Sequence, residues 1–257
     1  MPHSPDFEAR ARAIRLVAFD IDGTLLRWQL FHSVVAEIAE AQPEPNETYI
    51  AATKAFDKWK RRTDPGAFYT YERATLDAWF ALIKTITPAE YHAATRTVFE
   101  AQKDFTYRYT RDLIKTLQAQ DYAIIAISGS HQETVQMIGD YYGFDMAIGS
   151  EYPVENGRFT GEEITPFTDK GEALRKIVAE HNLQWEDSYA VGDSNSDAKM
   201  LALVANPIAF NPDQNLLKHA QENNWKIVVE RKNVAYELAV QNGTYYLQNS
   251  ANSAAQK

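Results

Sequence analysis

The sequence contains no cysteine among its 257 residues, which excludes disulfide bonds, thiolate metal sites and cysteine nucleophiles. A chain without disulfides suits a reducing compartment, and we expect a cytoplasmic location. No apolar run approaches the roughly 20 residues that span a bilayer. The polar first residues, 1–13, lack the apolar segment of a secretory signal. We therefore expect no membrane partner.

Positive charge is also scarce, because 26 Lys and Arg are set against 35 Asp and Glu for a net charge of −9. Such a chain is not expected to bind the phosphate backbone of nucleic acids. With 45% hydrophobic and 24% charged residues, it has the composition of a globular protein that buries a core without covalent cross-links. Its length allows one large domain, or one domain with an insert.

Short apolar runs that stop at polar or acidic residues predict buried strands at 14–19, 122–127, 188–191, 207–210 and 225–229. Amphipathic patterns between several of them predict helices at 111–120, 133–142, 170–181 and 197–204. Strands that alternate with helices predict an α/β fold, in which helices cover both faces of a doubly wound parallel sheet. Residues 155–158, with Asn-Gly at their centre, predict a β-hairpin.

Residues 27–105 interrupt this alternation with helical periodicity and many aromatic side chains. We interpret them as an all-helical domain inserted between the first two core strands. The core would then comprise residues 1–26 and 106–247, and residues 248–257 would form a flexible tail. We expect the aromatic residues to form the insert's own core, and the basic cluster at 58–62 to be a solvated helix face.

Two acids, Asp20 and Asp22, directly follow the first predicted strand, in the string Asp-Ile-Asp-Gly-Thr. Residues two apart at a strand end point to the same side, where two carboxylates suit a hard divalent cation. A carboxylate is also a nucleophile for phosphoryl transfer, and a second can act as acid and base. Gly23 allows a tight turn, while Thr24 offers a hydroxyl and an N–H group. The alternative is an exposed acidic turn.

Two further segments have one chemical and one structural interpretation each. Ser128 and Gly129 follow the second strand and precede a helix, an arrangement that suits a phosphate oxygen but also an ordinary helix N-cap. Lys170 begins a predicted helix, where a cation opposes the helix dipole. It would neutralise phosphate charge if it pointed into the crevice at the strand ends, and the alternative is a surface lysine.

The string Gly-Asp-Ser-Asn-Ser-Asp at 192–197 follows the third strand. A calcium loop fails here because Ala198 stands where the loop needs glycine and Val204 where it needs glutamate. The interpretation that remains places Asp193 at a strand end, where it completes the cation site that begins at Asp20.

Together these four segments resemble, in order, the four motifs of the haloacid dehalogenase superfamily, and most closely its phosphoserine-phosphatase-like branch. The resemblance implies a Rossmann-like core with a helical cap, and Mg²⁺-dependent hydrolysis of a small phosphorylated metabolite through an aspartyl-phosphate. The resemblance implies that Asp20 is the nucleophile and Asp22 the general acid and base, and that Asp20, Asp22 and Asp193 hold the metal. It implies phosphate binding by Gly23, Thr24, Ser128, Gly129 and Lys170. Asp197, Ser194 and Ser196 would surround the metal and phosphate ligands without contacting metal or phosphate themselves.

The insert should decide the substrate. The family's glutamate for the substrate amine corresponds to Gln29 in this chain, which cannot pair with an ammonium group, and Arg73 lies near the position of the family's arginine. His32 is a further specificity candidate, although we expect His32 and His131 to be surface residues. Two alternatives stay open: a phosphotransferase or mutase of the same fold, and a non-catalytic module that binds a phosphorylated ligand.

Overall fold

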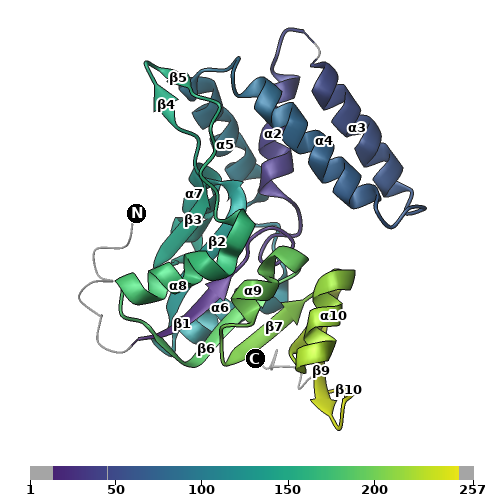
Figure 1. Ribbon diagram of the computed structural model, residues 1–257, viewed down its shortest axis with the longest axis vertical. Coiled ribbons are helices and arrows are strands. Elements are labelled where there is room, and N and C mark those ends of the chain that lie inside the picture. The colour runs from purple at the N-terminus through teal and green to yellow at the C-terminus, as the bar shows by residue number, and fades with distance from the viewer. Residues whose placement is uncertain (1–13, 45, 249–257) are drawn as a thin grey trace, which may run out of the picture.

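A computed structural model describes residues 14–44 and 46–248, so the first 13 residues and most of the predicted tail lie outside it. Its centre is an eight-stranded sheet in the order β10-β9-β8-β7-β6-β1-β2-β3 (Figure 1). The strands are β1 Arg15–Phe19, β2 Ala123–His131, β3 Met146–Ser150, β6 Gln184–Gly192, β7 Asn206–Phe210, β8 Lys226–Arg231, β9 Val234–Gln241 and β10 Thr244–Leu247. Every pair from β3 to β8 is parallel, whereas β9 and β10 are antiparallel additions. The predicted α/β class with a parallel sheet is confirmed.

Helices cover both faces of the sheet, because successive strand residues point to opposite sides. Val17 and Phe19 belong to one buried cluster with side chains of α6 and α7, and Leu16 and Ala18 to another with side chains of α8, α9 and α10. These helices are α6 Arg108–Gln118, α7 Gln132–Tyr142, α8 Lys170–Glu180, α9 Ala198–Leu201 and α10 Gln214–Asn223. Short 3-10 turns precede two of them, at Phe167–Asp169 and Asn195–Asp197.

Each predicted core strand lies on an observed one, but the sequence patterns did not reveal β3, β9 or β10. The predicted hairpin is confirmed as β4 Val154–Glu155 and β5 Arg158–Phe159. Asn156 and Gly157 at its turn have φ values of 50° and 75°. Such left-handed values are typical of the tight turn that Asn-Gly favours.

Four helices lie between β1 and α6, and they stand above the core in Figure 1: α2 Leu30–Glu40, α3 Glu47–Lys60, α4 Ala67–Leu82 and α5 Pro88–Gln102. The chain leaves the core after Leu26 and returns at Thr106, and these two residues form a β-bridge. Backbone bonds flank the bridge, from Arg27 N–H to the Phe105 carbonyl and from Tyr107 N–H to the Leu25 carbonyl, each 2.9 Å long. The two connections between the insert and the core therefore run side by side.

Aromatic side chains of the insert pack on one another, but in the cluster that follows only Tyr71 is buried and the other four rings are partly exposed. The rings of Trp28, Phe56, Trp59, Phe68 and Tyr71 form contacts with centroid distances of 5.0 to 6.3 Å. The basic cluster at 58–62 is exposed as predicted, with the lysines paired to nearby aspartates. Among the described residues, no helix combines the length and apolarity that crossing a bilayer requires.

The expectation that His32 and His131 are surface residues is wrong. His32 is 5% exposed and lies 4.5 Å from the Tyr71 ring, while His131 is fully buried and stacks on Phe31 at 5.1 Å. Neither ring nitrogen of His32 has a hydrogen-bond partner among the described residues. Burial lowers the pKa of both imidazoles to about 3. Both face aromatic rings because the insert folds over the strand ends, which the local sequence does not reveal.

Replacing His32 with phenylalanine should remove a destabilisation that develops in acid. A histidine whose folded-state pKa is below its unfolded value must lose its proton on folding, so its contribution is complete above about pH 6.5 and falls as the pH drops. The His32→Phe variant should therefore gain about 2 kcal/mol of unfolding free energy over the wild type between pH 7.5 and pH 5. Urea unfolding of both proteins at the two pH values measures their unfolding free energies. If the variant and the wild type differed equally at pH 7.5 and pH 5, the prediction would be contradicted.

Candidate active site

The candidate site lies where β1 and its parallel neighbour β6 end. Asp20 follows β1, and its N–H group donates to the Val191 carbonyl of β6 at 2.9 Å. Asp193 follows β6 and Asp197 lies in the next turn. Each of the three acids offers a carboxylate oxygen within 4.8 Å of the others. Parallel strands end at the same edge, so the sheet brings together acids 173 residues apart in the chain.

Lys170 connects two of these acids. Its ammonium group lies 2.6 Å from Oδ1 of Asp20 and 2.7 Å from Oδ1 of Asp197, and the lysine is 2% exposed. Burial disfavours the charged lysine, but the two carboxylates outweigh it and raise its pKa. The alternative of a surface lysine is therefore wrong. Lys170 is the first residue of α8, and from there its side chain reaches Asp20. Asp169 caps the same helix, because its carboxylate accepts the Glu172 N–H group.

Asp197 is held from both sides. Oδ1 pairs with Lys170, and Oδ2 accepts the N–H groups of Asp193 and Ser194 at 3.1 and 3.0 Å. The Ser194 hydroxyl contacts Oδ2 at 3.2 Å and the Ser196 hydroxyl at 2.8 Å. A carboxylate with both oxygens engaged fixes the shape of the loop that carries Asp193.

Asp22 is held by the core and by the insert together. Its Oδ1 accepts the N–H group of Leu30, the first residue of α2, and its Oδ2 accepts the Ser128 hydroxyl at 2.9 Å. Burial raises the pKa of Asp22, although its hydrogen bonds with Leu30, Ser130 and Ser128 act in the opposite direction. Asp22 therefore lies where the core meets the insert, and burial there shifts its equilibrium toward the protonated form.

The segment from Ser128 to Ser130 continues β2 and does not begin the next helix. The N-cap of α7 is His131, so the N-cap interpretation of Ser128 is wrong. The Ser128 hydroxyl accepts the Ser130 N–H group at 3.0 Å as it donates to Asp22. Gly129 is partly exposed at the edge of the site, and its carbonyl accepts the Ser150 hydroxyl at 2.9 Å.

Thr24 differs from its prediction as a hydroxyl available to phosphate. The residue is fully buried, and its hydroxyl has no hydrogen-bond partner among the described residues. Its carbonyl accepts the Thr110 hydroxyl of α6 at 2.9 Å. Thr24 therefore ties the loop after β1 to the first turns of α6, with its hydroxyl withdrawn from the cleft.

Gly23 is the point where the loop after β1 meets the loop after β6. Its φ is +82°, and a Cβ atom there would lie 2.0 Å from Oδ2 of Asp193. No side chain fits in that space, and the left-handed backbone favours glycine independently. Glycine is thus required for Asp193 to approach Asp20 and Asp22.

The electrostatics of the site suit a bound cation. Burial raises the pKa of Asp20, with repulsion from Asp197 and Asp22 adding to the rise that Lys170 opposes. Burial and repulsion from Asp20 and Asp197 raise the pKa of Asp193 well above its usual value. Clustered buried carboxylates favour a divalent cation with oxygen ligands, since its charge offsets their repulsion. The donor set therefore fits magnesium.

The specificity candidates lie on α2 and α4. Gln29 is the N-cap of α2, directly before the Leu30 N–H group that binds Asp22. Arg73 is exposed on α4 and lies 4.0 Å from Asp77 of the same helix. His32 belongs to the buried aromatic cluster described above. Gln29 is thus the candidate next to the residue that holds Asp22, whereas Arg73 faces solvent.

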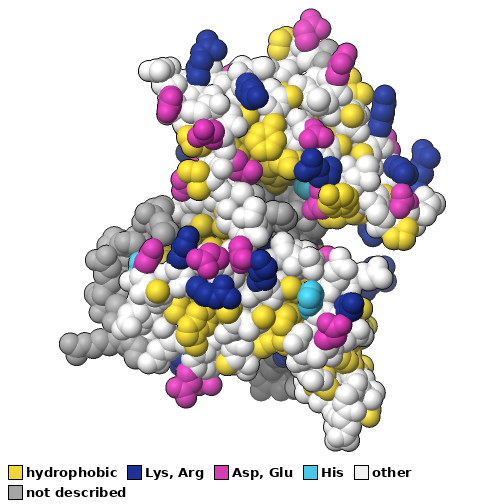
Figure 2. All heavy atoms as spheres, viewed as in Figure 1, with side chains coloured by type: hydrophobic (Ala, Val, Ile, Leu, Met, Phe, Trp, Pro, Cys, Tyr) yellow, Lys and Arg dark blue, Asp and Glu magenta, His cyan; other side chains and the backbone are white. Residues whose placement is uncertain are grey.

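Sequence reasoning missed one acid of the insert, Glu72 on α4. Burial, and then repulsion from Asp213, raise the pKa of Glu72 to about 7. Asp213 caps α10, and its N–H group donates to the Asp193 carbonyl at 2.8 Å. Figure 2 shows a notch between the insert and the core on the side where α4 and α10 lie in Figure 1. Helical periodicity did not reveal Glu72, because Asp213, which raises its pKa, is 141 positions away in the sequence.

The chain matches the model of the haloacid dehalogenase-like hydrolase family over residues 17–202. It is 26% identical over 229 residues to a histidinol-phosphatase from Neisseria meningitidis, covering 83% of this chain and 97% of that one. It is 34% identical over 108 residues to an inhibition of morphological differentiation protein from Streptomyces azureus, covering 41% and 39%. The chain spans half or less of the length of the first curated relatives that it matches.

Among solved structures, a phosphoserine phosphatase with an analogue of its phospho-aspartyl intermediate superimposes with a TM-score of 0.60 at 22% identity. That likeness covers 86% of this chain and 96% of the other. At this identity it shows the shared fold. The family match covers more than half of the chain and includes each acid of the candidate site, so this protein belongs to the haloacid dehalogenase-like hydrolase family.

Proposed function

We propose that this protein is a magnesium-dependent phosphatase that hydrolyses a small phosphomonoester through an aspartyl-phosphate at Asp20. The observation that carries the proposal is the pairing of Asp20 with Lys170 through Oδ1, which leaves Oδ2 for the reaction. A second acid, Asp22, follows two residues later in a setting that raises its pKa. A nucleophile and an acid of this kind are what ester cleavage requires.

The proposed reaction has two steps, formation of the aspartyl-phosphate and its hydrolysis. Oδ2 of Asp20 attacks phosphorus as the bond to the ester oxygen breaks, and Asp22 gives its proton to the departing alkoxide. Asp22, now a carboxylate, takes a proton from a water molecule that attacks the aspartyl-phosphate. Inorganic phosphate leaves, Asp20 is restored as a carboxylate, and Asp22 is protonated again for the next cycle.

The neighbours of these acids have matching roles. The Lys170 ammonium stabilises the charge on the transferring phosphoryl group, since it already lies 2.6 Å from the nucleophile. The Ser128 hydroxyl keeps Asp22 in position, and we assign Ser128 to the group that binds phosphate. Gly23 and Gly129 keep the backbone close to the phosphoryl oxygens.

Magnesium would be held by the carboxylates of Asp20 and Asp193 and by the backbone carbonyl of Asp22. A bound divalent cation neutralises charge on the phosphoryl oxygens and on the clustered acids. Asp197 supports these metal ligands indirectly. One of its oxygens pairs with Lys170, and the other accepts the N–H group of Asp193.

For the alcohol part of the substrate, we propose a group that carries an amine. The names histidinol-phosphatase and phosphoserine phosphatase describe relatives whose substrates contain an amine. Gln29 cannot pair with an ammonium group, and we assign that role to Glu72 of the insert, whose carboxylate is repelled by Asp213. The Asp213 N–H group in turn bonds the Asp193 carbonyl. A cationic substrate would favour the charged form of Glu72 and gain a charge-assisted contact.

Replacing Asp20 with asparagine should abolish phosphate release. The purified protein, with and without magnesium, is assayed on a panel of phosphomonoesters beside Asp20→Asn. The wild type should release phosphate only with magnesium, and the variant should lose about 10³-fold or more of the rate because an amide is not a nucleophile here. Equal rates in the two proteins would refute the proposal. Transfer to an added sugar without free phosphate would instead identify a mutase.

Replacing Gly23 with alanine should weaken magnesium binding. The new Cβ would displace the Asp193 carboxylate and strain the left-handed backbone. We expect about 10- to 100-fold weaker magnesium affinity, with a parallel loss of rate at limiting magnesium. Titration of activity and of thermal stability against magnesium measures both. Gly157→Ala is a suitable control, because its φ is also positive but nothing lies within 4 Å of the added atom.

Replacing Glu72 with glutamine should raise KM selectively. At pH 8, above the pKa of about 7, Glu72 is mainly charged. Its loss should raise KM for amino-alcohol phosphates about tenfold and leave KM for glycerol phosphate nearly unchanged. Arg73→Gln, at the neighbouring exposed position, provides the control. If both substrates were affected equally, Glu72 would not recognise an amine.

A further inference from the structure

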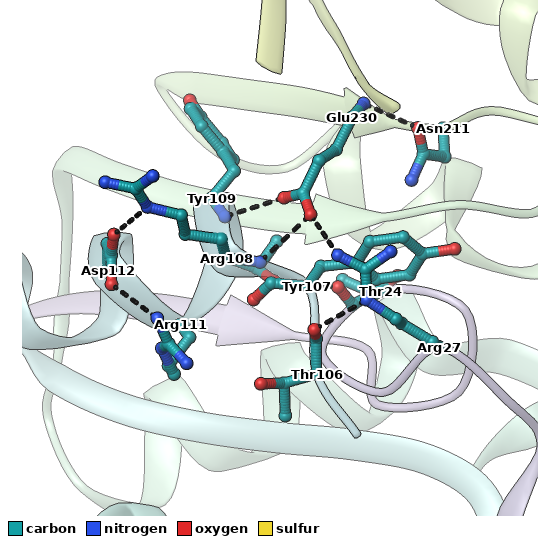
Figure 3. Close-up of polar contacts among 11 residues, drawn as sticks. Thr24, Arg27, Thr106, Tyr107, Arg108, Tyr109, Arg111, Asp112, Asn211 and Glu230 are labelled. Atoms are coloured by element: carbon teal, nitrogen blue, oxygen red, sulfur yellow. Dashed lines mark hydrogen bonds and ion pairs between the residues drawn. The ribbon is translucent and has the colours of Figure 1, made fainter. Parts of the chain in front are cut away.

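A buried carboxylate outside the candidate site joins the two connections of the insert. Glu230 lies on β8, and its side chain is 2% exposed. It pairs with the Arg27 guanidinium and accepts the N–H groups of Arg108 and Tyr109, at 3.2 and 2.8 Å (Figure 3). One side chain of the C-terminal half therefore contacts the chain where it leaves the core and where it returns.

The contact supplies what α6 lacks. The N-cap of α6 is Tyr107, which makes no side-chain cap bond, and the first turn of α6 contains no acid. The first N–H groups of a helix need acceptors and favour negative charge. Glu230 provides both from a distant strand, so the start of α6 is completed only when β8 is in place.

Arg27 adds the second half of the arrangement. Its Nε donates to the Thr106 carbonyl at 2.7 Å, and its guanidinium lies 4.5 Å from the centre of the Tyr107 ring. The Arg27 side chain therefore crosses from the outgoing connection to the returning one. With Glu230 behind it, this residue fixes the spacing of the two connections.

The backbone of Glu230 is also linked to the loops of the candidate site. The Glu230 N–H group donates to Oδ1 of Asn211 at 2.9 Å, and the Asn211 side chain also bonds the Tyr107 hydroxyl. Two residues later, the Asp213 N–H group donates to the Asp193 carbonyl at 2.8 Å. The anchor of the insert and the loop of the metal-binding aspartate thus share one short segment after β7.

We propose that Glu230 is a positioning residue that, through Arg27 and the start of α6, sets how the insert covers the site at Asp20. This inference rests on the proposed phosphatase function. Asp22 depends on the insert because the Leu30 N–H group holds its carboxylate. If the connections loosen, the insert can no longer place substrate contacts and Asp22 against the nucleophile at Asp20.

The test compares two substrates that depend differently on the insert. An amino-alcohol phosphate needs contacts from the insert and a proton from Asp22, whereas acetyl phosphate has a good leaving group and needs neither. Glu230→Gln keeps the size of the side chain but removes its charge. We expect it to lower kcat/KM for the amino-alcohol phosphate at least about tenfold and to change acetyl phosphate hydrolysis less than about twofold.

Two further variants separate positioning from general destabilisation. Glu222→Gln breaks the exposed Glu222–Lys218 pair of 3.8 Å, which joins two residues of α10 and leaves the contacts of Glu230 in place. It should leave both substrates unaffected. Arg27→Gln should reproduce the selective loss, and the double variant with Glu230→Gln should lose less than the two single losses combined, since both act on one contact.

The outcomes are distinguishable. Equal losses on both substrates, no loss on either, or the same loss in Glu222→Gln would overturn the positioning role while the wild type remained an active phosphatase. A wild type that, with magnesium present, releases phosphate from no ester of the panel and not from acetyl phosphate would overturn the proposed function, and this inference with it. Faster amide exchange at Arg108 and Tyr109 in Glu230→Gln, beside the selective loss, would support the proposal.

Discussion

The buried contact of Lys170 with Asp20 and Asp197 is the interaction on which the candidate site depends. Three charged groups that are buried away from solvent are stable only if each is paired with an opposite charge and hydrogen-bonded. Lys170 offsets two carboxylates, and the loop N–H groups satisfy the remaining oxygen of Asp197. The residual repulsion among Asp20, Asp22 and Asp193 is the reason that the site suits a divalent cation.

In the proposed mechanism, the insert positions the general acid as well as covering the site. Asp22 accepts a hydrogen bond from the first residue of α2, and its other hydrogen bonds come from serines of β2. Any movement of α2 would therefore change both the position and the pKa of this acid. Gly23 extends the coupling, because it lets the Asp193 loop touch the same turn. The proposed substrate cover, proton transfer and metal binding would thus depend on the same turn after β1.

Much of this arrangement could be predicted from the sequence. An apolar run that stops at acids marks a strand end, and parallel strand ends converge, so Asp20, Asp22 and Asp193 could be placed together from local patterns. The edge strands could not. β9 and β10 have partly exposed residues without a clear apolar alternation, and β9 exists because β8 offers it an antiparallel partner.

The sequence by itself determined which groups meet at the strand ends, because apolar periodicity and strand direction are local properties. Only the tertiary structure decided the state of those groups. It withdrew the Thr24 hydroxyl, buried His32 and His131 among aromatic rings, and gave Glu72 and Glu230 neighbours more than a hundred residues away. The physical reason is that burial and the partners of a charge depend on which elements pack together, and no local pattern encodes that packing.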